Sequence, residues 1–430
     1  MTQPRRPAMI RTAVLAASAT GALVLSGCAG AAGPADGGQD QTDTKEFSIS
    51  FGPANDEKTG YEILAEQYMQ ENPDVTITMN PLPGETYPQA IRTQLQAGNA
   101  SDLFVAAPGT GQPYSLVPLA EAGLISPLDG AAADVIPAGS DDLFVVDGEV
   151  YGQALSVAFV ANIFNTTPGV EYPADLAGLL DQCAAAQAEG RSFFVIAGAV
   201  PINTGIMAQS IAATRVYAED PDWNDKRAAG EVSFADSEGW QDTLETVLAL
   251  DEAGCFQAGA EGAGFDAITN GLTQGTSLGM FGPSGTASEI NAAAGGHASF
   301  VVEAFPVETE GDARFGLASS TYAYALSADS KNKVAALKFL DWMAEPEQTA
   351  RFAEIEGDLP VSGIDDLDLA DSVFAPVEDI LKSGSYAPLP NATWPNAAVY
   401  DALGMGVQGL LTGQRTVDQV LADMDAAWGE

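Results

Sequence analysis

The pattern of hydrophobic and polar positions opens with a predicted strand at residues 46–51, where every second side chain is apolar. Helical spacing follows over residues 61–68, and alternation returns at residues 75–79. A predicted helix at residues 87–97 then leads into a short apolar strand at residues 103–107. The order β-α-β-α-β indicates a parallel sheet covered by helices, which is an α/β fold.

A second set of elements starts near residue 156, with no repeat and no low-complexity linker before it. Its predicted strands cover Phe193–Ala197, Ser277–Phe281 and residues 300–304, and its predicted helices cover Leu176–Ala188, Asn203–Tyr217 and Asp236–Ala253. Helices are also predicted from about Ser330 to Met343, from Pro346 to Gly357, over Ala397–Leu411 and over Val417–Trp428, the last with Thr416 as its N-cap.

The N-terminal segment differs from the rest of the chain. Three arginines without any acid precede a 14-residue apolar run from Thr12 to Leu25. A membrane-spanning helix needs about 20 apolar residues, so this run is typical of a signal peptide over residues 1–27. The run ends in Leu25-Ser26-Gly27-Cys28, which resembles the lipobox of bacterial lipoproteins. That resemblance implies a diacylated Cys28 on the extracytoplasmic face of the cell membrane; the alternative is an ordinary signal with an accidental cysteine.

Composition limits the possible partners of the chain. Residues 29–45 hold no hydrophobe larger than Ala, so we expect residues 28–45 to be a lipidated cysteine and a flexible tether of roughly 20–25 Å. The whole chain has a formal charge of −42, and the chain without its signal has −45. Such acidity disfavours nucleic-acid binding, because phosphate contacts need clustered Lys and Arg.

Cysteine and histidine usage narrows the chemistry. Apart from Cys28, the cysteines are Cys183 and Cys255, an even pair in an oxidising compartment. We expect a disulfide between them; two buried free thiols are the alternative. The single histidine, His297, has no catalytic signature around it, and no phosphate-binding P-loop occurs. We expect no metal site, no cofactor and no catalysis.

Several segments from residue 46 onward resemble those of group 1 extracellular solute-binding proteins of ABC importers, the maltodextrin- and oligosaccharide-binding type. They are Gly98–Val105, Leu119–Leu128, Val150–Ala154, Phe164-Asn165, Tyr322–Ser327 with Ser330–Leu340, Leu359–Val361 and Thr412–Leu421. None is diagnostic alone, but their order and spacing match the family. The resemblance implies two α/β lobes, a periplasmic-binding-protein-like fold, that close on a solute about hinge crossovers.

The resemblance also implies boundaries. Lobe one would comprise residues 46–155 plus 301–345, and lobe two would comprise residues 156–300 plus 346–430. The hinge would lie near Ala154–Val157 and Val301–Pro306. The implied partners are a small solute, most simply a sugar, and the permease subunits of an ABC transporter, and we expect the protein to be a monomer.

Candidate ligand contacts lie in loops beyond the strand ends, where α/β sheets bind ligands. These loops are Gly52–Asn55, Pro108–Gln112, Ser156–Val157, Val200–Thr204 and Gly282–Thr286. Flat aromatic rings suit sugar faces, and hydroxyls and amides suit sugar hydroxyls. We expect Trp394, Tyr322 and Tyr87 as rings, each with core packing as its alternative. The polar candidates, each with a turn or capping role as its alternative, are Asn55, Thr110, Ser156, Asn203, Ser284 and Ser320.

Two departures from the family bear on ligand length. The strand at 103–107 is followed by Pro108 rather than an aromatic residue, and Gly282-Pro283 is followed by Ser284-Gly285 rather than Trp. Two stacking platforms are therefore missing, which favours a short sugar over a long chain. The competing hypotheses are a binder of a non-sugar solute, an exported carbohydrate-active enzyme with paired carboxylates, and a purely structural surface lipoprotein.

Overall fold

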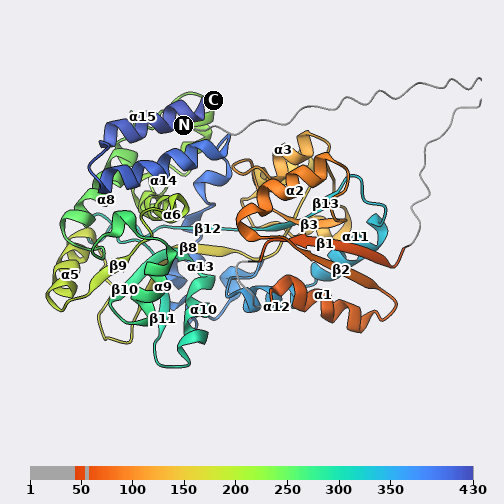
Figure 1. The fold of residues 1–430 in the computed structure, drawn as a ribbon, viewed down its shortest axis with the longest axis horizontal. Coiled ribbons are helices and arrows are strands. Elements are labelled where there is room, and N and C mark those ends of the chain that lie inside the picture. The colour runs from red at the N-terminus through yellow and green to blue at the C-terminus, as the bar shows by residue number, and fades with distance from the viewer. Residues whose placement is uncertain (1–43, 54–57, 430) are drawn as a thin grey trace, which may run out of the picture. The chain divides into compact units, whose positions relative to one another are not determined.

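The computed structural model describes residues 44–53 and 58–429, which form two lobes, each built on its own sheet (Figure 1). The expected signal peptide, Cys28 and the expected tether up to residue 43 lie outside the described residues, and so does Asn55. Within the described part of the chain, no helix is long and apolar enough to cross a membrane.

The first sheet has the order β2-β1-β3-β13-β4, with β7 also paired to β13. β1 is parallel to β2 and β3, as the alternation of strands and helices predicts, whereas β13 is antiparallel to β3, β4 and β7. Its strands are β1 (Glu46–Phe51), β2 (Thr76–Pro81), β3 (Leu103–Ala106), β4 (Ile125–Ser126), β7 (Gln153–Ala154) and β13 (Ala323–Ser327). In Figure 1, β13 lies in teal beside strands from the red and orange end of the chain.

Helices of lobe one cover this sheet around a shared apolar core that includes Ile49, Phe104 and Phe339, each fully buried. The helices are α1 (Gly60–Glu71), α2 (Tyr87–Gln96), α3 (Leu116–Glu121), α4 (Asp141–Phe144), α11 (Lys333–Met343) and α12 (Pro346–Glu356), with 3₁₀ turns η1 (Gly84–Thr86) and η2 (Gly130–Asp134) and the hairpin β5 (Val145–Val146) and β6 (Glu149–Val150). Thr59 and Glu62 form a capping box that begins α1.

The second sheet is mixed, with the order β14-β12-β8-β10-β9 and β11 paired to β8. Its central strand β8 (Ala158–Asn165) is buried along its whole length. The other strands are β9 (Ser192–Val195), β10 (Ser277–Pro283), β11 (Phe300–Glu303), β12 (Gly316–Ser319) and β14 (Tyr386–Ala387). Because β11 and β12 both pair with β8, residues 301–319 belong to lobe two and not to lobe one as expected.

Helices of lobe two flank both faces of this sheet. They are α5 (Leu176–Ala188), α6 (Pro201–Ala212), α7 (Trp223–Ala228), α8 (Glu238–Glu252), α9 (Phe265–Thr273), α10 (Gly285–Ala294), α13 (Glu378–Ser383), α14 (Ala397–Leu411) and α15 (Val417–Trp428), with short turns η4 (Ala260–Gly262), η5 (Ile364–Asp366), η6 (Ala375–Val377) and η7 (Pro390–Ala392). Thr416 caps α15, as its sequence predicts. By contrast, α12 packs against α1, and Phe352 enters the lobe-one core, so residues 346–356 lie in lobe one.

A disulfide joins Cys183 of α5 to Cys255, which follows α8. Both cysteines are fully buried in the lobe-two core. The bond therefore ties together two segments that are 72 residues apart in the sequence.

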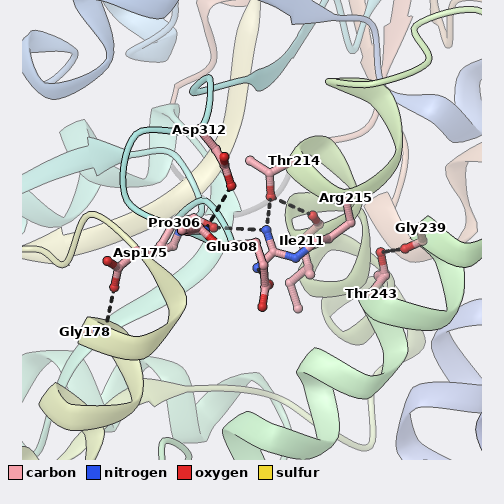
Figure 2. Close-up of polar contacts among 11 residues, drawn as sticks. Asp175, Gly178, Ile211, Thr214, Arg215, Gly239, Thr243, Pro306, Glu308 and Asp312 are labelled. Carbon is pink, nitrogen blue, oxygen red and sulfur yellow. Dashed lines mark hydrogen bonds and ion pairs between the residues drawn. The ribbon is translucent and has the colours of Figure 1, made fainter.

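A buried arginine ties the end of α6 to the loop after β11 (Figure 2). Arg215 lies in a π-helical turn, η3 (Ala213–Tyr217). Its guanidinium contacts the Glu308 carboxylate at 2.7 Å and donates to the Thr214 hydroxyl at 2.9 Å. It also lies 5.8 Å from the centre of the Phe305 ring. These contacts hold the loop that precedes β12 against the helical layer.

Candidate functional site

Three segments pass between the lobes. The first runs from β7 to β8 at residues 155–157, the second from β12 to β13 at residues 320–322, and the third follows α12 at residues 357–359. Val157 and Leu359 exchange two backbone hydrogen bonds, of 2.8 and 2.9 Å, which hold the first and third segments side by side. The first crossover coincides with the predicted hinge at 154–157, and its role as a hinge stays a prediction. The predicted hinge at Val301–Pro306 does not cross between the lobes, because it begins within β11, a strand of the lobe-two sheet.

Asp358 is held at the junction of these crossovers. The Ser156 hydroxyl donates to its Oδ2 at 2.8 Å, and the Ser284 hydroxyl donates to its Oδ1 at 3.0 Å. Ser284 also accepts a hydrogen bond from the backbone N–H of Phe159, at the start of β8. Two serines expected to bind ligand therefore bind a carboxylate of the protein.

Burial raises the pKa of Asp358 to about 6, against the hydrogen bonds from Ser156 and Ser284, which lower it. The charge of Glu356 adds a smaller upward contribution to this pKa. Because the folded-state pKa exceeds the ordinary value, the proton is bound more tightly in the folded state. The stability that this group contributes is thus present below about pH 4 and is lost as the pH rises through about 6.

We therefore expect Asp358→Asn to stabilise the protein at pH 7.5 by on the order of 1–3 kcal/mol, because it removes a buried charge and keeps the shape. The gain should become small near pH 4, where Asp358 is protonated in the folded protein and already partly protonated in the unfolded chain. Denaturant unfolding at both pH values measures this, with the exposed Asp366→Asn as the matched control. A variant equally stabilised or destabilised at both pH values would contradict the assignment.

A cleft of about 570 Å³ opens between lobe one and helix α10 of lobe two. This volume is within the range of small-molecule sites, roughly 300–1,000 Å³. The lobe-one wall comes from the first turns of α1 and α2, the ends of β1 and β3, the crossover at 322 and the end of α12. The lining residues are Gly52, Pro53, Lys58, Thr59, Tyr61, Gly84, Tyr87, Pro88, Val105, Tyr114, Gly285, Ser288, Glu289, Ala292, Tyr322, Glu354, Ile355 and Glu356.

Four tyrosines line this cleft. Tyr322 is 47% exposed, so its ring face is open to a ligand. Tyr87 is 4% exposed, and its hydroxyl donates to the carbonyls of Ser50 and Val105, which fixes the ring at the cleft floor. The Tyr114 ring meets the Tyr87 ring edge-on, with centroids 5.7 Å apart. The lobe-one wall is therefore rich in aromatic side chains, as small-molecule sites commonly are.

Thr110 contacts lobe two itself. Its backbone N–H donates to the Ala392 carbonyl at 2.7 Å, and its hydroxyl donates to the Trp394 carbonyl at 2.6 Å. The flanking Gly109 and Gly111 make this approach possible, since a Cβ at either one would lie 2.0 Å from a carbonyl oxygen of Ala392 or Asn391. Gly109 also has a φ of 74°, which favours glycine. Thr110 thus joins the lobes in this conformation.

Trp394, expected as a stacking ring, is completely buried in the lobe-two core. Its ring packs edge-on against Phe234 at 5.7 Å and at a tilt against Trp240 at 6.1 Å. A sugar cannot reach either face, so the core-packing alternative describes this residue. Its position in a loop predicted an exposed ring, but the ring points into the lobe-two core.

Two polar candidates also serve the framework. Asn203 is buried; it accepts from the Ala197 N–H at 2.8 Å and donates to the Phe281 carbonyl, which joins α6 to β10 and to the segment after β9. Ser320 is buried and donates to the Tyr322 carbonyl at 2.8 Å, which shapes the crossover. Neither lines the cleft, whereas Tyr322 and Tyr87 do.

Sequence reasoning missed Tyr61, Tyr114, Glu356 and Asp358. Tyr61 belongs to an apolar stripe at helical spacing, which predicts a core position, but as the second residue of α1 it also reaches the cleft. Glu356 and Asp358 flank Gly357, the left-handed residue that ends α12. The sequence feature that could have indicated Glu356 and Asp358 is a pair of carboxylates at the end of a predicted helix, just before Leu359-Pro360.

A family model described as bacterial extracellular solute-binding protein matches residues 52–350. The chain belongs to this family. The solute-binding protein is therefore a binder of small solutes that works outside the cytoplasm, as the resemblance of its segments implies.

Similar proteins share nearly the whole length of this solute-binding protein. Proteins described as binding proteins from Brucella abortus (strain 2308) and Brucella suis biovar 1 (strain 1330) are each 24% identical over 92% of this chain and 93% of theirs. Among solved structures, a protein from a study of xylan utilisation by Caldanaerobius polysaccharolyticus has a TM-score of 0.75 at 20% identity, covering 89% of this chain and 99% of that one.

Two further structures cover 89% of the solute-binding protein and 98% of their own chains, each with a TM-score of 0.73. One is described as a chitin oligosaccharide binding protein, at 20% identity, and the other as a solute-binding protein in complex with raffinose, at 18% identity. At these identities the likeness establishes the two-lobed fold.

Proposed function

We propose that this protein captures a small carbohydrate and delivers it to the permease of an ABC importer, without catalysing a reaction. The observation that carries the proposal is the cleft between the lobes, whose lobe-one wall presents the open ring of Tyr322 beside Tyr61, Tyr87 and Tyr114. Aromatic faces bind the C–H faces of sugar rings, and the hydroxyls beside them suit the sugar's polar edge.

The proposed mechanism is closure about the three crossovers at residues 155–157, 320–322 and 357–359. Tyr322 lies within the second crossover, so a ring that stacks on the ligand also belongs to the hinge. Rotation of the lobes would bring α10 toward the tyrosines and exclude water from the cleft, which strengthens the ligand's hydrogen bonds. The closed form would then be the one that the transporter recognises.

The composition of the α10 wall supports a short ligand. Gly285, Ser288, Glu289 and Ala292 form that wall, and none of them is aromatic. Among the described lining residues, stacking surface is therefore confined to the lobe-one side, which suits one or two sugar rings rather than a long chain. The structural relatives described with xylan, chitin oligosaccharide and raffinose support a carbohydrate as the class of solute.

A thermal-shift panel of mono-, di- and oligosaccharides tests the proposal, with amino acids, polyamines and glycerophosphodiesters as non-sugar solutes. A ligand that binds the native state alone adds about 2.7 kcal/mol at 100 times Kd, an easily measured shift. We expect the largest shift from a mono- or disaccharide, with no turnover of aryl glycosides.

Tyr322→Ala is expected to weaken sugar binding by at least about ten-fold, because it removes the most open stacking ring. Its effect on the stability of the free protein should be small, since the ring is 47% exposed. Phe265→Ala is the matched control, as Phe265 is 53% exposed on α9 and does not line the cleft. Full affinity in Tyr322→Ala would remove this ring from the site, and a shift with non-sugar solutes alone would disprove the carbohydrate assignment.

We also propose that Cys28 carries lipid and anchors the protein to the extracytoplasmic face of the membrane. The motif Leu25-Ser26-Gly27-Cys28 at the end of the signal supports this. Cys28→Ala should leave the protein as an unprocessed precursor or release it into the medium, as membrane fractionation would show. A fully processed, membrane-bound Cys28→Ala protein would be incompatible with the anchor.

A further inference from the structure

Acidic side chains dominate the charge of the cleft. Among the described lining residues, Glu289, Glu354 and Glu356 are acidic and Lys58 alone is basic. The Lys58 ammonium is already engaged with the Glu66 carboxylate, at 2.6 Å on the surface of α1. Within the described lining, no free cation therefore balances the three glutamates.

Glu356 is the most enclosed of these three glutamates. Its Oε1 accepts a hydrogen bond of 2.7 Å from the backbone N–H of Gly60, at the start of α1, and its second oxygen has no hydrogen-bond partner among the described residues. Asp358 lies two residues further on and adds negative charge to the same corner. Burial raises the pKa of Glu356, and the Gly60 hydrogen bond opposes this shift. Across the described chain, no Lys or Arg contributes to the pKa of Glu356 or Asp358.

Two tyrosine hydroxyls point independently to a ligand at this corner. Tyr61 and Tyr114 are 7% and 8% exposed, and both line the cleft. Neither hydroxyl has a hydrogen-bond partner within residues 44–53 and 58–429. Each side chain is more than nine-tenths buried, and its hydroxyl is left to the cleft, so a ligand with polar hydrogens would supply hydrogen bonds that the protein does not.

We propose, on the basis of the carbohydrate-binding function above, that the cleft selects aminated sugars, with Glu356 receiving the protonated amine. A sugar ammonium beside Glu356 would replace the missing counter-charge of a partly buried carboxylate. Its donors would reach the unpaired carboxylate oxygen, and charge-assisted hydrogen bonds of this kind are the strong ones. The rings of Tyr61 and Tyr322 would add cation–π attraction. A neutral sugar of the same size leaves the carboxylate uncompensated.

Matched ligand pairs test the selectivity without changing the protein. Isothermal titration would compare glucosamine with glucose, galactosamine with galactose, and the chitosan disaccharide with cellobiose. We expect each amine to bind at least about ten-fold tighter than its neutral counterpart. The N-acetylated form of each amine, which has lost the charge, should bind like the neutral sugar. Raising the salt from about 20 mM to about 0.5 M should reduce the preference.

Glu356→Gln tests the assigned carboxylate, since glutamine keeps the acceptor for the Gly60 N–H and removes the charge. The ratio of amine to neutral-sugar affinity should fall to about one in this variant. Glu347→Gln, on the exposed face of the same helix, should keep the wild-type ratio. If the Glu356 variant does not fold, N-acetylation and salt dependence on the wild-type protein decide the question.

The outcomes separate this inference from the function on which it rests. Equal binding of amines and neutral sugars, or a preference that survives in Glu356→Gln, overturns the inference and leaves the carbohydrate function standing. Binding of no sugar, aminated or neutral, overturns both. A polyamine that binds where no sugar does also overturns both, because the selected solute would then not be a carbohydrate.

Discussion

Replacing Trp394 by Ala is expected to lower the free energy of unfolding of the ligand-free protein by about 3–5 kcal/mol. The indole is fully buried and packs against Phe234, Trp240 and Tyr400. Its removal would leave a cavity at the point where α8, α14 and the loop at 390–394 meet. Urea unfolding measures this loss.

The Trp394 experiment has a direct contrast in the cleft. Tyr322→Ala should give the opposite pattern, with weak ligand binding and nearly unchanged stability. Trp394→Phe should lose less stability than Trp394→Ala, because a ring still fills most of the space. A Trp394→Ala protein that kept its stability and lost ligand binding would show instead that Trp394 belongs to the ligand site.

The second large effect is expected from the disulfide. The bond between Cys183 and Cys255 closes a loop across a separation of 72 residues. Loop closure of this length restricts the unfolded chain and stabilises the native state by about 4 kcal/mol in the chain-entropy model. The double variant Cys183→Ala, Cys255→Ala should lose about that amount, since both positions are buried and alanine introduces no polar group.

Reductant provides the matched control for the disulfide. Unfolding of the wild-type protein with reductant should approach that of the double variant, and the double variant should not respond to reductant. A double variant as stable as the wild type would show that the bond adds nothing to the native state. The even count of cysteines after residue 28 favoured this pairing over two buried free thiols.

Local patterns along the chain predicted most elements, because apolar side chains recur at the spacing of a helix or a strand or form short unbroken runs. The alternation at residues 46–51 and the stripes of Leu176–Ala188 and Ala397–Leu411 fit β1, α5 and α14 closely. The central strand β8 was not predicted: it is buried along its whole length, as β3 and β9 are, but Asn162 and Asn165 interrupt its apolar run. The predicted lobe boundary after residue 300 was also wrong, because β11 and β12 pair with β8, a strand far from them in the sequence.

The site was less predictable than the fold. Tyr322 and Trp394 both lie outside the predicted helices and strands, and composition alone cannot tell an outward ring from an inward one. Ser156 and Ser284 do follow strand ends, as predicted for ligand contacts, but their hydroxyls donate to Asp358 of the protein itself. The acidic corner at Glu356 arises only when the end of α12 meets the start of α1, which no local pattern reveals.

The position of β13 has a consequence for the synthesis of the protein. This strand lies between β3 and β4 in the first sheet, and Ala323 pairs with Ala106 across more than two hundred residues. A nascent chain that ends before residue 323 therefore lacks a central strand of its N-terminal lobe. Pairings so distant in sequence form slowly. Lobe one thus cannot complete its sheet until synthesis has passed residue 327, so β1, β2 and β3 are made long before the strand that joins them to β4.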